Sequence, residues 1–148
     1  LLLGFGADAD ENGVENGIKL VMFDNSDPYN LKEVGLYSIH HEGDSYIYSG
    51  ALWERKSLLI APNKNLIGVP VTVETYSPEY HFTADSKYMF FSYENGDFTF
   101  KGELSMGDIN GYGGSRALYI GDYVYAVSQN CFVSADIETL TEVDRFYF

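Results

Sequence analysis

The chain has 148 residues and a formal net charge of −13, from 9 basic and 22 acidic side chains, and 16% of its residues are aromatic. An acidic surface repels phosphate backbones and anionic lipid headgroups, which argues against nucleic acid and membrane surfaces as partners. No apolar run approaches the roughly 18 residues of a membrane-spanning helix, so we expect no membrane insertion of this region. Acidity with abundant aromatic residues instead suits cations, neutral polar ligands such as glycans, or protein partners.

Short runs rich in β-branched and aromatic residues, separated by turn residues, predict an all-β fold. The first group of expected strands is 1–5, 18–24 and 31–39. The second is 57–61, 66–73, 87–93 and 98–104, and the third is 116–120, 123–128, 131–136 and 140–148. Asn95-Gly96 and Gly121-Asp122 stand between adjacent runs and predict tight hairpin turns. The single cysteine, Cys131, lies in an apolar run and predicts a buried structural thiol.

A repeated pattern of strand, turn and strand appears three times, in residues 23–37, 92–104 and 135–147. The last two copies are separated by roughly the 40 to 45 residues of a four-stranded propeller blade. The sequence therefore predicts a partial β-propeller of two to three four-stranded antiparallel blades, at about 1–39, 51–106 and 112–148. Residues 40–50 and 75–86 exceed the length that the repeat requires, and we expect them to form insert loops. A β-sandwich with a similar number of strands is the alternative.

Two segments in particular, "DADENGVENGIKLVMFDNSDP" and "LYIGDYVYAVS", resemble the secreted C-terminal β-propeller proteins of bacteria and archaea, distant relatives of WD-repeat propellers. The resemblance extends over nearly the whole chain and is weakest in the two inserts. It implies a propeller exported from the cell, without an assigned activity. Because a closed propeller needs roughly four to eight blades, we expect residues 1–148 to be the C-terminal part of a single propeller domain.

The acidic loop near the start of the chain has the pattern that opens a calcium-binding loop. Asp8, Asp10 and Asn12, followed by a glycine, place oxygen-bearing side chains at alternate positions, and Asn16 can add another. Lys19 stands where an EF-hand places its bidentate glutamate, and no helices flank the loop, so an EF-hand is excluded. The loop is either a calcium site completed by other oxygen atoms or a hairpin whose acidic side chains are solvated.

Four aromatic residues in or beside loops are the candidate ligand-binding or partner-binding residues: Trp53, Tyr80, Phe82 and Tyr112. An aromatic ring with an apolar face and a polar rim can stack on a sugar or anchor a protein partner. The alternative for each ring is ordinary packing in the fold.

Other chemical patterns are weaker. His40 and His41 are adjacent, so an extended chain points them to opposite faces, and His81 lies in the other insert, which does not favour a zinc or copper site. Residues 111–117, "GYGGSRA", lack the final glycine and the following helix of a nucleophile elbow. Catalytic residues therefore stay unassigned.

The sequence as a whole favours an exported binding or scaffold module at the surface of a bacterial cell, which calcium can stabilise. The alternative is an extracellular glycan hydrolase or lyase that uses acidic residues in the propeller channel, and a cytosolic WD-like adaptor is a third hypothesis. A partial ring leaves two blade faces uncovered, one formed by 1–5 and 18–23 and one by the blade carrying Cys131 and Phe132. We therefore expect this fragment to form a homo-oligomer.

Overall fold

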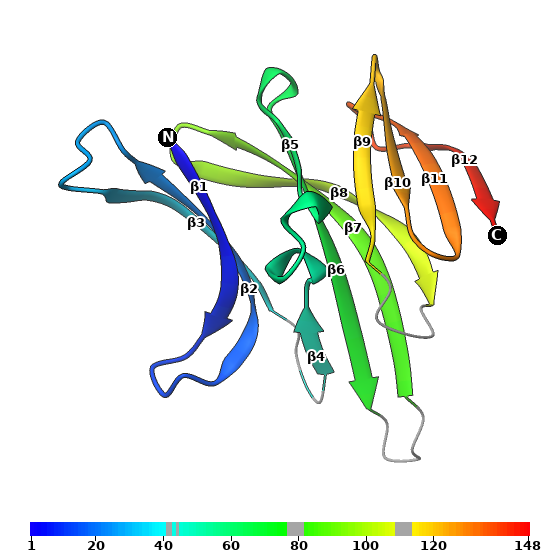
Figure 1. Ribbon diagram of the computed structural model, residues 1–148, viewed down its shortest axis with the longest axis horizontal. Coiled ribbons are helices and arrows are strands. Elements are labelled where there is room, and N and C mark those ends of the chain that lie inside the picture. The colour runs from blue at the N-terminus through cyan, green and yellow to red at the C-terminus, as the bar shows by residue number, and fades with distance from the viewer. Residues whose placement is uncertain (41–42, 44, 77–81, 109–113) are drawn as a thin grey trace.

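The computed structural model describes the whole chain except residues 41–42, 44, 77–81 and 109–113, and the side chains of Phe82 and Asp108 also lie outside the described part. Three antiparallel sheets stand side by side and are called A, B and C in chain order (Figure 1). The predicted all-β class is confirmed. In the described ranges, no helix has the length and apolar character needed to cross a membrane.

Sheets A and C are meanders, in which each strand pairs with the next one along the chain. Sheet A contains β1 (Leu2–Ala9), β2 (Glu15–Asp24) and β3 (Lys32–His40). Sheet C contains β9 (Arg116–Ile120), β10 (Tyr123–Val127), β11 (Cys131–Asp136) and β12 (Glu142–Tyr147). The predicted turn between β9 and β10 is present, and Gly121 adopts a φ of +60° there, a conformation that costs glycine little.

Sheet B lies between the other two sheets and has five strands. They are β4 (Ser45–Tyr48), β5 (Leu59–Ala61), β6 (Leu66–Tyr76), β7 (Phe82–Glu94) and β8 (Asp97–Asp108). Asn95 and Gly96 form the predicted turn between β7 and β8, with φ values of +52° and +99°. The short 3-10 turns are η1 (Gly50–Leu52), η2 (Arg55–Ser57) and η3 (Pro62–Lys64).

Strand β4 was not expected, because the sequence places it within the first insert. It pairs with β6 from Tyr48↔Thr72 to Ser45↔Thr75. Much of the second insert is also strand, because β6 and β7 extend their pairing as far as Tyr76↔Phe82. The described strand residues of the two inserts therefore lengthen sheet B.

Two apolar cores hold the three sheets together, one on each face of sheet B. Between sheets A and B, Ile18 and Leu20 of β2 pack with Val69 and Val71 of β6. Between sheets B and C, the core includes Tyr88, Phe90, Leu104, Val124, Cys131 and Val133. Because β6 is covered on both faces, its residues 66–72 are all buried, which explains the continuous apolar run in the sequence.

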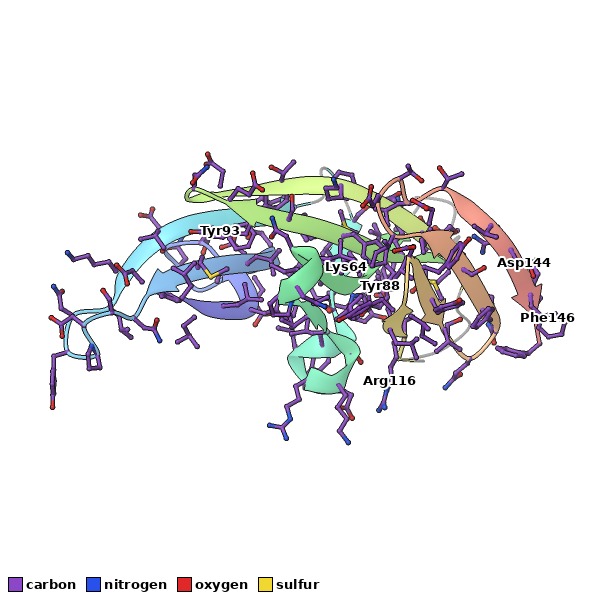
Figure 2. The ribbon with its side chains drawn as sticks, turned by 90° about the horizontal axis from the view of Figure 1, so that it is seen from above. Lys64, Tyr88, Tyr93, Arg116, Asp144 and Phe146 are labelled. Carbon is purple, nitrogen blue, oxygen red and sulfur yellow. The ribbon has the colours of Figure 1, made fainter. Side chains whose placement is uncertain are left out.

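Cys131 is fully buried in the core between sheets B and C, and its Sγ donates to the carbonyl of Met106 at 3.2 Å. The predicted structural thiol is therefore confirmed, and Cys131 lies on the inner face of the blade that was expected to leave a face uncovered. The outer face of sheet C is instead formed by residues of the opposite parity, because neighbouring residues in a strand point to opposite faces. It exposes Leu118 at 50%, Ile120 at 65% and Phe146 at 61%. Figure 2 shows Phe146 on β12, at the end of the molecule away from sheet A.

We expect these exposed side chains to make the protein self-associate, because apolar patches of this kind rarely stay uncovered on soluble monomers. Light scattering coupled to size exclusion at micromolar concentration should show a mass above that of one chain. Phe146→Ser should shift the equilibrium toward monomer, since it removes a ring that is 61% exposed. A monomer that also fails to bind a dye specific for exposed apolar surface would contradict this expectation.

Candidate ligand-binding site

The carboxylate of Asp10 organises the acidic loop between β1 and β2. Its Oδ1 accepts hydrogen bonds from the backbone N–H groups of Asn12 at 2.8 Å and Val14 at 2.9 Å. The bond from Val14 is the largest cause that lowers the pKa of Asp10, followed by the bond from Asn12. Asp10 therefore stabilises its own turn, as aspartate often does in tight turns.

Asp8 lies on the outer face of sheet A and faces two basic side chains. Its Oδ1 lies 3.3 Å from Nζ of Lys19, and its Oδ2 lies 3.2 Å from Nε2 of His40. A hydrogen bond from Ser38 is the largest cause that holds the pKa of Asp8 below its usual value; burial opposes it, while Lys19 and His40 add to it. Asp8 therefore takes part in a small polar network on the sheet.

The predicted calcium ligands are adjacent in sequence but have different partners in space. Asp8 faces Lys19 and His40. Asp10 and Asn12 bond within the turn, and the carbonyl of Asn16 lies 3.3 Å from Nδ1 of His40. Within the described residues, no group of three or more His, Cys, Asp or Glu side chains is placed to hold a metal ion. Calcium binding by this loop stays a prediction, and His41 and His81 lie outside the described residues.

Sheet B carries a different candidate site, where the edge of β6 is interrupted. Strand β5 pairs with residues 66–68 of β6 and β4 pairs with residues 72–75. Pro70 lies between these two ranges and has no N–H to donate, so a gap in the ladder suits it. Its carbonyl accepts a hydrogen bond from the Ser49 hydroxyl, which lies just before η1. The chain between β4 and β5 therefore bulges out of the sheet as η1 and η2 (Figure 1).

Three aromatic side chains lie beside this bulge, Tyr46 and Tyr48 on β4 before it and Trp53 within it. The rings of Tyr46 and Tyr48 are stacked, with centroids 5.9 Å apart and an interplanar angle of 30°. The ring of Trp53 follows, 6.5 Å from Tyr48 and tilted by 59°. Trp53 is 76% exposed and Tyr46 is 43% exposed. Rings that pack against each other but remain open to solvent can act as a platform for a flat ligand.

A small hollow of about 100 Å³ opens beside Trp53 and is called the Trp53 hollow. Its lining residues are Tyr48, Gly50, Trp53, Pro70, Thr72, Ser86, Gly114 and Ser115. Tyr48, Thr72 and Ser86 form one row across β4, β6 and β7, and the residues just before β9 close the opposite side. The hollow therefore lies where sheets B and C meet.

An ion pair connects the two sides of this region at its rim. Glu54 caps η2 by accepting a hydrogen bond from the Lys56 N–H at 3.0 Å. The other carboxylate oxygen of Glu54 lies 3.5 Å from Nη2 of Arg116, at the start of β9. Arg116 extends away from the sheets beside the 3-10 turns (Figure 2). Both side chains are about half exposed, so the pair contributes little stability.

A larger crevice of about 630 Å³ lies elsewhere between sheets B and C, and its lining includes Lys64, Glu94, Lys101 and Glu138. All four of these charged residues are exposed. Long charged side chains at an open surface are well solvated, so this crevice places few constraints on a ligand. The Trp53 hollow has the stronger features of a binding site.

Comparison with known proteins assigns the fold. The family model described as "Beta propeller domain" matches residues 1–140. The chain belongs to this family. No curated protein and no solved structure matches the chain. The three sheets of this β-propeller domain lie side by side as blades do, and each sheet is open. The blade limits of 1–39, 51–106 and 112–148, and the position of the chain at the C-terminal end of a single propeller, stay predictions.

The sequence singled out part of the site of this propeller domain. Trp53 was a candidate and lies at the hollow. Tyr80 and Tyr112 lie outside the described residues, and so does the side chain of Phe82, although β7 begins at that residue. Tyr46 and Tyr48 were missed, and the alternation in "SYIYSG" is the signal that could have revealed them as one face of a strand.

The calcium hypothesis predicts that excess calcium raises the melting temperature of the protein and that Asp10→Ala abolishes this rise. Asp24→Ala is a matched control, because Asp24 accepts a hydrogen bond from the Ser26 N–H in the next turn of the same sheet. In chelator, both variants should melt at a lower temperature than the unmodified protein, because each loses the carboxylate that accepts the backbone hydrogen bonds of its turn. Identical melting curves of the unmodified protein in calcium and in chelator would contradict calcium binding and leave Asp10 a turn residue.

Proposed function

We propose that this β-propeller domain is a binding or scaffold module outside a bacterial cell, and that it binds a glycan through Trp53 and its neighbours. The supporting observation is the exposure of Trp53, which is 76% accessible while Tyr48 packs against it at 6.5 Å. Indole is mostly apolar, so removing its face from water against the apolar face of a sugar ring is favourable.

The net charge of −13 supports a neutral ligand over an anionic one. Stabilisation by calcium at the β1–β2 loop is a separate part of the proposal and is supported by the sequence pattern. Self-association through the outer face of sheet C is a third part, supported by the exposed side chains of that face. Binding through Trp53 requires neither of these two features.

The test is calorimetric titration of the protein with a panel of soluble bacterial and plant polysaccharides. Trp53→Ala should weaken binding at least about 10-fold, the loss typical of a central aromatic contact. Tyr46→Ala should also weaken it, whereas Tyr123→Ala should not, although Tyr123 is 44% exposed and Tyr46 is 43% exposed. Tyr123 lies on sheet C and does not line the hollow.

Equal losses of affinity in Tyr46→Ala and Tyr123→Ala would show that the ligand binds nonspecifically to exposed aromatic side chains and not to the aromatic platform. Absence of binding to every polysaccharide in the panel would overturn the glycan proposal. Release of reducing ends from the same panel tests the hydrolase or lyase alternative, because a binding module should leave the polymer uncut.

A further inference from the structure

Three hydroxyl side chains of the Trp53 hollow are buried and available to a ligand. Thr72 is 8% exposed, Ser86 is 2% exposed and Ser115 is 3% exposed, and all three line the hollow. Within the described part of the chain, the structure shows no hydrogen bond from these three hydroxyls to another protein group, and Ser57 carries the one fully enclosed hydroxyl without a partner, so the oxygen atoms of Thr72, Ser86 and Ser115 open into the hollow. Polar atoms at the wall of a hollow pair with water or with a ligand, so this group is a set of donors and acceptors that a ligand can use.

The size of the hollow limits what can enter it. Its volume of about 100 Å³ is well below the roughly 300 Å³ of the smallest pockets that enclose a drug-sized ligand. A complete sugar ring therefore cannot enter, but a substituent of a few heavy atoms can. The ring that carries the substituent has to stay outside, at the level of Trp53.

The lining determines the chemistry of that substituent. Among the described residues that form the hollow there is no charged side chain, so an ionised group would lose its hydration without compensation. Tyr48 and Pro70 provide apolar walls, and the three hydroxyls provide polar contacts. The complementary group is small and neutral and combines a methyl group with an amide. An acetamido group has these properties.

We propose that the Trp53 hollow binds the acetamido group of an N-acetylated hexosamine, whose sugar ring stacks on Trp53. This inference rests on the proposed function and names the substrate class of the same site. In an N-acetylated hexosamine the acetamido group is attached directly to the ring, so the group and the ring can occupy the hollow and the platform together. The hydroxyls of Thr72 and Ser86 donate to the amide carbonyl or accept from the amide N–H.

The experiment compares oligomers of N-acetylglucosamine with glucose oligomers of the same linkage and length. Trp53 is the single tryptophan of the chain, so its fluorescence reports directly on this site. The N-acetylated oligomer should bind at least about 10-fold more tightly, which corresponds to one or two hydrogen bonds and a buried methyl group.

Two variants remove the buried hydroxyls with little change in volume, Thr72→Val and Ser86→Ala. Each should weaken binding of the N-acetylated oligomer about 3- to 10-fold, the loss expected for one hydrogen bond, and leave binding of the glucose oligomer unchanged. Ser57→Ala is the matched control, because the Ser57 hydroxyl is buried without a partner and does not line the hollow. Circular dichroism of all three variants verifies that they fold.

The outcomes separate this inference from the proposed function. Equal affinity for the two oligomers, with a loss in Trp53→Ala, would overturn the acetamido assignment and leave the glycan-binding proposal standing. Binding of an acetyl-lysine peptide in preference to the N-acetylated oligomer would also overturn it, since the sugar ring would then be unnecessary. Failure of every glycan to bind would overturn both proposals.

Discussion

Sheet B buries both of its faces, and the rest of the structure depends on this burial. Residues 66–72 of β6 are buried without a break, so neighbouring sheets have to cover both sides of the strand. Each large apolar side chain removed from water contributes roughly 1.5–3 kcal/mol. Sheets A and C therefore lie against the two faces of sheet B. Their own outer faces are uncovered and carry exposed residues such as Leu2 and Phe146.

The candidate site arises from the one position at which β6 departs from regular pairing. Pro70 has no N–H, and its carbonyl is satisfied by Ser49 and not by a neighbouring strand. The chain between β4 and β5 consequently leaves the sheet and carries Trp53 into solvent. A backbone irregularity at a sheet edge thereby places an exposed ring beside the hydroxyls of Thr72 and Ser86, which lie on paired strands.

Local signals allowed much of the fold to be predicted from the sequence. The turns at Asn95-Gly96 and Gly121-Asp122 require positive φ angles that their own residues favour, and apolar runs identify most strands. Strand β4 was missed because its pairing with β6 depends on residues about 30 positions away. The hollow could not be predicted either, because Thr72, Ser86 and Ser115 come from separate segments that only the stacked sheets bring together.

Chemical denaturation of Gly68→Ala beside Gly6→Ala tests most directly whether the face of sheet B that meets sheet C is closely packed. A Cβ at Gly68 would lie 2.6 Å from the ring of Tyr88 and 3.0 Å from Leu59, whereas a Cβ at Gly6 would meet nothing within 4 Å. We expect Gly68→Ala to lower the free energy of unfolding by about 1–3 kcal/mol, as overpacking does. Gly6→Ala should leave it unchanged or raise it slightly. Equal stability of the two variants would contradict a closely packed junction between sheets B and C.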